Sequence, residues 1–254
     1  MTARMGKADL HIHTREGDGL DTIEQIFDHV ESRTDLDIIA ITEHDSLETS
    51  LRARDVWARR RRCFDLIAGV EVTTLQGHIV ALYLEEPVES LRPIEDTLDA
   101  VHRQDGVCFI PHPMSWFTRS IGHGTMRRVS RRQQAGLWFD GIELANLSPP
   151  TQPFLARARR LNKEQYGLPV VGASDAHFVQ AIGSAYTSFQ GSTADELRAA
   201  FATGDLTGHQ ACYPSLREVG FARAISVPIA GLGATPRRLG WRRTVMSFLR
   251  RHFE

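Results

Sequence analysis

The stretch ADLHIHTREGDGL, residues 8–20, places two histidines one residue apart at the end of a short apolar run, with a carboxylate in the loop that follows. Side chains two apart on a β-strand point the same way, so His11 and His13 are expected to face one point. Asp18 is near enough in sequence for the loop to return it to that point. The stretch therefore predicts a strand that carries chemically active groups at its C-terminal end.

Short apolar runs of this kind recur along the chain, interleaved with amphipathic stretches of helix length. This alternation predicts repeated βα units, and about seven of them predict an α/β barrel. The expected strands span residues 9–13, 37–42, 65–72, 78–84, 107–112, 141–146, 169–174 and 184–189. The expected helices span residues 22–32, 47–62, 93–104, 153–166 and 193–204.

Composition limits the class of protein further. The length of 254 residues suits one barrel domain, and the net charge of −1 gives no overall attraction to nucleic acid or to a membrane. The three cysteines are far apart and form no C-x-x-C pair, which argues against a disulfide framework and against a thiolate metal site. No export signal is evident at the N-terminus, so we expect a cytoplasmic protein.

Histidines and carboxylates follow several of the expected strands at equivalent places. Barrel enzymes carry their active groups at the C-terminal ends of the strands. Imidazole and carboxylate without thiolate are ligands for Zn²⁺, Mn²⁺ or Fe²⁺ rather than Ca²⁺. The candidate metal ligands are His11, His13, Asp18, His44, Glu71, His78, His112, Asp175 and His177. The remaining histidines that fall on expected helices or in the tail, to which we assign no role, are His29, His102, His209 and His252.

At these residues the sequence resembles the polymerase and histidinol phosphatase domain family, known as PHP. The resemblance covers about residues 8–190, in the motifs DLHIHT, IAITEHDS, GVEVTT, GHIVALYL, PHPMS, ELAN and SDAHF. It implies a distorted (β/α)7 barrel with two or three divalent ions, zinc, manganese or iron, at the C-terminal ends of its strands. The barrel would span residues 1–213, followed over residues 214–254 by a linker and a basic amphipathic tail.

The resemblance also implies how the ligands divide among the ions. One ion would be held by His11, His13, Glu71 and Asp175, with Glu71 bridging to a second at His78 and His112, and a third would be held by Asp18, His44 and His177. The second family motif usually reads T-D-H, whereas this chain has Glu43 before His44. Strand alternation turns Glu43 away from His44, so we expect it to support the site rather than to bind metal.

The first loop, HTREGDG, resembles that of the small stand-alone phosphoesterases of the family, which act on nucleotides and short oligonucleotides. The expected reaction is hydrolysis of a phosphate ester by a hydroxide that bridges two ions near Glu71, with His44 and His177 also catalytic. Clustered ions lower the pKa of bound water to about 7 and clamp the attacking and leaving oxygens. No G-x-S-x-G elbow or P-loop pattern offers another route.

Substrate contacts are sought among the basic residues near these motifs. Arginine forms a planar fork that suits phosphate, so Arg15 and Arg119 are candidates, together with His123. The segment over residues 114–134 carries further arginine pairs and no acidic residue, which is typical of a solvated helix face and could also steer an anionic substrate. Asn146 ends an expected strand and is a candidate for orienting a ligand or the substrate.

Two other functions stay open. An amidohydrolase acting on a C–N or C–O bond also begins with H-x-H in a barrel, but its typical binuclear form bridges the ions with a carboxylated lysine. The only lysines, Lys7 and Lys163, do not end an apolar run, so phosphoester chemistry is preferred. A non-catalytic regulatory PHP module is the other alternative, and the complete ligand set argues against it.

The C-terminal tail raises the question of a partner. Trp241, Val245, Leu249 and Phe253 are four residues apart and share one helical face, with arginine pairs between them. Such a helix suits an anionic membrane surface or a protein partner, and it equally suits packing against its own barrel. The oligomeric state is not determined by the sequence.

Overall fold

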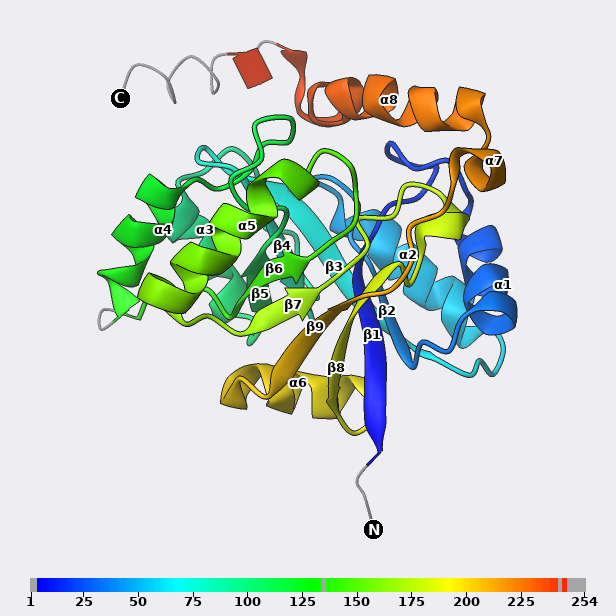
Figure 1. Ribbon diagram of the computed structural model, residues 1–254, viewed down its shortest axis with the longest axis horizontal. Helices are drawn as coiled ribbons and strands as arrows, with labels where there is room; N and C mark the ends of the chain where they lie inside the picture. The colour runs from blue at the N-terminus through cyan, green and yellow to red at the C-terminus, as the bar shows by residue number, and fades with distance from the viewer. Residues whose placement is uncertain (1–3, 134–135, 242–243, 246–254) are drawn as a thin grey trace.

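The computed structural model describes residues 4–133, 136–241 and 244–245. Within them a mixed sheet winds into a nearly closed barrel in the order β7-β6-β5-β4-β3-β2-β1-β8-β9 (Figure 1). The strands are β1 (Met5–Ile12), β2 (Ile38–Ile41), β3 (Asp65–Thr73), β4 (His78–Leu82), β5 (Val107–Ile110), β6 (Gly141–Ala145), β7 (Val170–Gly172), β8 (Ala185–Gln190) and β9 (Leu206–Gln210). The barrel of the α/β class expected from the sequence is confirmed.

The helices lie outside the barrel and at its two ends. They are α1 (Ile23–Arg33), α2 (Leu47–Ala58), α3 (Ile94–His102), α4 (His123–Ser130), α5 (Gln152–Leu161), the π-helix η2 (Asn162–Tyr166), the 3-10 helix η3 (Val179–Ala181), α6 (Ala194–Thr203), α7 (Leu216–Val219) and α8 (Phe221–Leu239). Thr22 and Thr193 begin α1 and α6 with capping boxes, in which the threonine side chain accepts a hydrogen bond from the backbone three residues on. These local signals explain why most helix positions follow from the sequence.

The sheet is not all parallel, which corrects the expectation of regular βα repeats. β4 runs antiparallel to both β3 and β5, and β8 and β9 are also antiparallel to their neighbours. Only residues 74–77 join β3 to β4, and a parallel crossover needs about a dozen residues. The short loop therefore forces a hairpin, and Gly77 accommodates it with a φ of +143°.

The barrel closes by contacts around β7. Thr187 on β8 accepts a hydrogen bond from the Gly172 backbone N–H and donates one to its carbonyl, at 3.0 and 2.9 Å. A Cβ at Gly172 would collide with the Tyr186 carbonyl, so only glycine allows this approach. Beyond β7, Ala176 pairs with the end of β1, where its N–H donates to the His11 carbonyl at 3.1 Å. This closure brings the segment SDAH beside His11 and His13.

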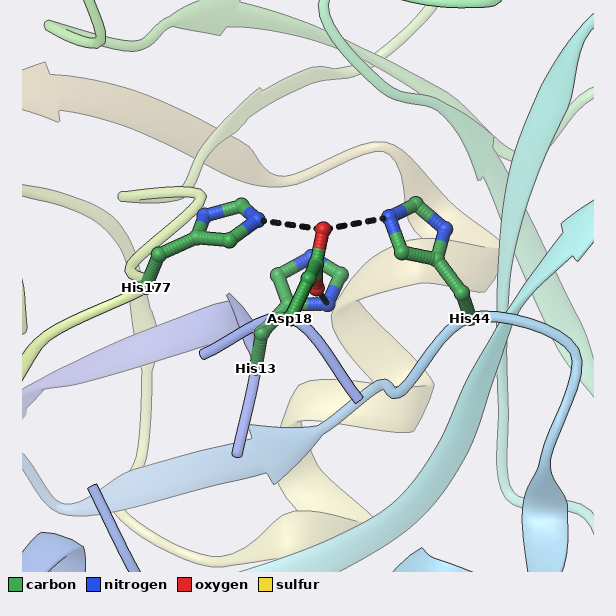
Figure 2. A group of neighbouring side chains, drawn as sticks. All are labelled: His13, Asp18, His44 and His177. Atoms are coloured by element: carbon green, nitrogen blue, oxygen red, sulfur yellow. Dashed lines mark ion pairs between the residues drawn. The ribbon is translucent and has the colours of Figure 1, made fainter. Parts of the chain in front are cut away.

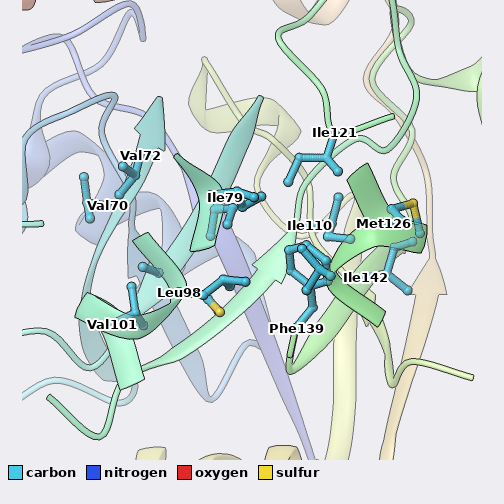
Figure 3. Close-up of a cluster of buried hydrophobic side chains, with 14 of the residues drawn as sticks. Val70, Val72, Ile79, Leu98, Val101, Ile110, Ile121, Met126, Phe139 and Ile142 are labelled. Atoms are coloured by element: carbon cyan, nitrogen blue, oxygen red, sulfur yellow. The ribbon is translucent and has the colours of Figure 1, made fainter. Parts of the chain in front are cut away.

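Three apolar clusters hold these layers together. One gathers inside the sheet with α6 beneath it, one lies between β1–β2 and α1–α2, and one lies between β3–β6 and helices α3 to α5. Figure 3 shows the last, in which Val70 and Ile79 from the sheet pack with Leu98 and Met126 from the helices. Such burial is worth about 1.5–3 kcal/mol for each large apolar side chain, so the strand ends stand on a rigid base.

The structure after residue 213 differs from the one expected from the sequence. The stretch that we expected to be a linker forms α7 and α8, despite the two prolines and two glycines of SVPIAGLGATPRR. Contacts with the barrel, described below, offset the low helix propensity of those residues. His209, expected on a helix or in the tail, lies on β9, where its ring stacks on Tyr186 and hydrogen-bonds with the Ser188 hydroxyl at 2.7 Å.

The apolar face expected near the C-terminus is only partly within the described residues. Trp241 and Val245 are exposed, by 66% and 50%. Leu249, Phe253 and His252 lie outside the described residues. Among the residues that the structure describes, no helix is both long and apolar enough to cross a membrane. Contact of this tail with a membrane or a protein stays a prediction.

Candidate metal centre

The structure brings all nine candidate ligands to one end of the barrel. They form overlapping groups whose ligand atoms lie within 4.8 Å of one another: His13, Asp18, His44 and His177; His11, His13 and Asp175; His11, Glu71 and His112; and His44, Glu71 and His78. Every side chain in these groups is at most 15% exposed. Residues from six separate stretches of the sequence thus share one buried site.

Glu71 lies at the centre of this site. Its Oε1 is 2.8 Å from His78 Nδ1 and 2.9 Å from His112 Nε2. Its Oε2 is 3.1 Å from His44 Nδ1 and 3.3 Å from His11 Nε2. One carboxylate therefore faces two different sets of imidazoles, which is the arrangement that a bridging ligand requires.

Asp18 is the centre of a neighbouring group, drawn in Figure 2. Its Oδ2 lies 3.3 Å from His177 Nε2 and 3.5 Å from His44 Nε2, while its Oδ1 is 3.5 Å from His13 Nδ1. The loop after β1 has turned the carboxylate back over the strand end, as the opening stretch of sequence suggested. His13 and His177 stack at 4.3 Å between ring centroids, so the group is tightly packed.

Four of the histidines have Nδ1 in contact with a supporting side chain or a backbone carbonyl. His11 Nδ1 lies 3.0 Å from Glu143 Oε2, and His13 Nδ1 lies 3.4 Å from Glu43 Oε1. His112 Nδ1 meets the hydroxyl of Ser120 at 2.8 Å, and His177 Nδ1 donates to the Asp175 carbonyl at 2.9 Å. In each case the other nitrogen, Nε2, faces a carboxylate of the centre. Partners on one nitrogen select the tautomer that leaves a lone pair on the other, as in metal sites.

Several buried atoms of the centre have no hydrogen-bond partner within the described residues: His13 Nε2, Asp18 Oδ1, His44 Nδ1 and both ring nitrogens of His78. A buried polar atom without a partner costs about 1–3 kcal/mol. Divalent cations would engage these atoms, and imidazole with carboxylate is the donor set that such ions take. The residues present therefore fit divalent metals.

The backbone conformation of two candidate ligands also indicates a functional site. His112 has a φ of +30° and Asp175 a φ of +53°, although neither is glycine. Such residues in the left-handed region each cost on the order of 1–3 kcal/mol and are concentrated at functional sites. The backbone is thus strained at these two residues, and their side chains lie in the centre.

Comparison with known proteins agrees with the PHP resemblance of the sequence. A family model described as PHP-associated matches residues 154–206. A solved two-domain protein of Bacteroides vulgatus, containing a predicted PHP-like metal-dependent phosphoesterase, is similar with a TM-score of 0.66 and 20% identity, over 82% of this chain and 66% of that one. The matched segment and the shared barrel fold support a PHP-domain protein, as the sequence motifs suggested.

Curated relatives of this PHP-domain protein match part of it. The 5′-3′ exoribonuclease Rnm of Salmonella typhimurium is 38% identical over 154 residues, which are 59% of this chain and 46% of that enzyme. An uncharacterized protein of Methanocaldococcus jannaschii is 27% identical over 150 residues, which are 55% of this chain and 81% of that protein. The PHP-domain protein thus spans less than half the length of the exoribonuclease.

The carboxylates and imidazoles of the centre shift one another's pKa values. Burial opposes ionisation, but the carboxylates of Glu71 and Asp18 raise the pKa of His44 to about 10. Burial likewise opposes charge on His177, and Asp18 nevertheless raises its pKa to about 9. Burial lowers the pKa of His78 to about 4 in spite of Glu71. Burial raises the pKa of Glu71, but His44, His78 and His11 lower that pKa by more. The carboxylate of Glu71 therefore stays ionised.

Metal affinity of the PHP centre is expected to rise with pH. The raised pKa values of His44 and His177 mean that both carry protons at pH 7 in the metal-free chain, whereas a metal ligand must be neutral. Their ion pairs with Asp18 stabilise the metal-free chain below the ordinary pKa of 6.5, and that contribution is lost as pH rises through 9 to 10.

We expect binding of Zn²⁺ or Mn²⁺ to release at least two protons, because the pKa of His11 is raised as well, and to strengthen by about 100-fold or more per pH unit between about pH 6 and pH 8. Calorimetric titration in two buffers that differ in ionisation enthalpy measures both quantities. His209→Gln, on β9 outside the centre, is the control and should match the wild type. Affinity independent of pH, with no proton release, would contradict the expectation.

Two supporting carboxylates hold the imidazoles. Glu143 was not identified from the sequence, although a charge within the apolar run GIELA was a signal for it. Besides His11 Nδ1, it accepts hydrogen bonds from the His112 backbone N–H at 2.9 Å and from Asn146 Nδ2 at 2.6 Å. Asn146 therefore orients a supporting carboxylate. Glu43 accepts hydrogen bonds from the Thr14 backbone and hydroxyl, and a side chain at Gly17 would collide with it.

Glu143→Ala is expected to lower metal affinity about 10- to 100-fold, which is usual when a partner that orients a ligating histidine is lost. Glu143→Gln should lie between it and the wild type, because an amide keeps only one accepting oxygen. Glu164→Ala, at an exposed position of η2, is the control. Metal content after dialysis against graded chelator measures the effect, and equal retention by all four proteins would rule out a positioning role for Glu143.

The expected substrate contacts lie in different surroundings. Arg15 is exposed in the loop between His13 and Asp18. Arg119 is partly buried in the loop after His112, and its carbonyl accepts a hydrogen bond from the His78 backbone at 2.5 Å. His123 begins α4, and its ring contacts Gln165 and Tyr166 instead. Arg15 and Arg119 are thus next to the centre along the chain, whereas His123 is engaged by η2.

Proposed function

We propose that this PHP-domain protein is a metal-dependent phosphoesterase that hydrolyses esters of nucleotides or short oligonucleotides. One observation carries the proposal: imidazoles held at Nδ1 direct their Nε2 at the central carboxylates of Glu71 and Asp18. A structural histidine has no need of this arrangement, because its two nitrogens can be satisfied by any donor or acceptor. Ligands held rigidly before the ion binds lose little freedom on binding.

The nine ligands would hold two or three divalent ions of zinc, manganese or iron. Bound divalent ions would lower the pKa of water to about 7 and offset charge at the phosphorus and on the leaving oxygen. The chain holds Glu71 ionised between two sets of imidazoles. It keeps the ring of His177 oriented through the Asp175 carbonyl, so that Nε2 stays directed at Asp18.

Phosphate would be bound by arginine. Arg15 lies between two candidate ligands of the first loop, and Arg119 follows His112, so each arginine is close to the centre along the chain. A planar guanidinium can donate two hydrogen bonds to one phosphate. On α4, Arg128 pairs with Glu95 at 2.8 Å, which is consistent with the solvated helix face expected for the later arginines.

The likeness to the Salmonella exoribonuclease supports a nucleotide-containing substrate over other phosphate esters. The placement of the lysines disfavours an amidohydrolase. Lys7 Nζ pairs with Asp35 at 2.5 Å, and Lys163 is exposed in η2. The carboxylate that faces two sets of imidazoles is instead that of Glu71.

Activity of the purified full chain tests this proposal. With Mn²⁺, Zn²⁺ or Fe²⁺ added in turn, we expect hydrolysis of bis(p-nitrophenyl) phosphate and of short 5′-phosphorylated RNA, and none of a panel of cyclic amides. Glu48→Gln, an exposed site on α2, is the control for handling. A chain that binds metal but hydrolyses only an amide would favour the amidohydrolase alternative, and one that binds none would favour a non-catalytic module.

A further inference from the structure

Helix α8 lies across the end of the barrel that carries the metal centre (Figure 1). Hydrogen bonds from three of its side chains, called here the ties of α8, hold it against the barrel. Near its start, the Arg223 guanidinium donates to both carboxylate oxygens of Asp21, at 2.8 and 2.9 Å. Near its end, the Thr235 hydroxyl is 3.1 Å from that of Thr73, and Arg238 donates to the Glu16 carbonyl at 3.2 Å. The helix thus spans from the loop after β1 to the end of β3.

Between these ties the helix backbone reaches the centre itself. A Cβ added at Gly231 would lie 3.2 Å from Asp18 Oδ2. That oxygen faces both His44 Nε2 and His177 Nε2. Glycine inside a helix is about 1 kcal/mol less favourable than alanine. Its presence at this position has a physical reason, since any other residue would press on Asp18.

The covered side of the centre is therefore the group His13, Asp18, His44 and His177. A helix with side chains is about 10–12 Å across, so α8 covers the centre on the side of that group. His112 and Asn146 follow β5 and β6, which stand four and five places from β1 in the order of the sheet.

We propose that α8 is a wall that determines the size of the substrate: it admits the end of a chain or a small phosphate ester and excludes a continuous strand. The inference rests on the proposed function and specifies its substrate. The terminal phosphate would sit against Glu71 with the rest of the molecule leading away from α8. A strand without ends would have to cross the position of α8, which its three ties prevent.

Substitutions that remove the hydrogen bonds between α8 and the barrel test whether α8 limits the size of the substrate. The triple variant Arg223→Ala, Thr235→Ala, Arg238→Ala removes the ties, and Arg217→Ala with Arg237→Ala removes two exposed arginines of the same region as the control. Substrates are bis(p-nitrophenyl) phosphate, a short 5′-phosphorylated RNA and a circular RNA of the same sequence. We expect the wild type and the control to leave the circle intact, and the released variant to cleave it at least tenfold faster, with turnover of the small ester little changed.

Two results would overturn the role of α8: cleavage of the circular RNA by the wild type, or an intact circle with a folded triple variant whose α8 has become sensitive to protease. In either case, hydrolysis of bis(p-nitrophenyl) phosphate would still support the proposed function. Hydrolysis of none of the three substrates by any protein would overturn the proposed function and the wall with it. Gly231→Leu provides a second variant if the triple variant does not fold. It should lower bound metal by elemental analysis relative to Ala222→Leu on the exposed side of α8, and equal metal content would show that α8 does not press on Asp18.

Discussion

Glu71→Gln is expected to reduce turnover of a phosphate ester by about a thousandfold or more. The change keeps the shape of the side chain but removes its charge and replaces one oxygen with a donor. Oε1 and Oε2 together lie within 3.4 Å of five histidine nitrogens, so no other residue of the centre has as many contacts to lose. Metal catalysis supplies several kcal/mol of charge stabilisation, and about 4 kcal/mol corresponds to about a thousandfold in rate.

Turnover and metal content should be measured together on the Glu71→Gln protein, with the Glu48→Gln protein as the matched control. Circular dichroism and Tm verify the fold, because a buried ionic network that loses one partner can be destabilised by about 3–5 kcal/mol. Turnover within tenfold of the wild type, in a folded protein, would contradict the central place given to Glu71.

Removal of metal by a chelator is expected to abolish activity and to lower Tm. Metal that binds only the folded chain stabilises it by about 2.7 kcal/mol at a hundredfold excess over Kd, or roughly 5–10 °C for a chain of this size. The stripped centre leaves five buried polar atoms without hydrogen-bond partners among the described residues, which adds to the loss.

Scanning calorimetry before and after dialysis against chelator, followed by titration with Zn²⁺, Mn²⁺ or Fe²⁺, measures this effect. The ion that restores turnover at the lowest free concentration is the best candidate for the resident metal. The His209→Gln protein serves as a control, since its altered side chain lies on β9. Full activity in protein shown by elemental analysis to be free of metal would exclude the proposed chemistry.

The features of this protein that could be predicted from its sequence are those that depend on local patterns of residues. The H-x-H of residues 11–13, Glu71 and the D-x-H of residues 175–177 stand at strand ends, and strand ends follow from runs of apolar residues a few positions long. Because strand ends of a barrel meet at one rim, residue type and position were sufficient to predict that these side chains converge.

What the sequence did not reveal depends on contacts between distant segments. Glu143 supports His11 across 132 positions, and β4 turns antiparallel only because four residues join it to β3. The residues of α8 read as a linker because their own helix propensity is poor, and only docking on Asp21, Thr73 and Glu16 makes them a helix.

The sequence by itself therefore determined the barrel and the types of ligand at its rim, because alternation and strand ends are local properties. The tertiary structure alone decided which groups anchor each imidazole, and it placed α8 against Asp18. Those contacts form only when the closed barrel brings segments far apart in the chain within hydrogen-bond distance.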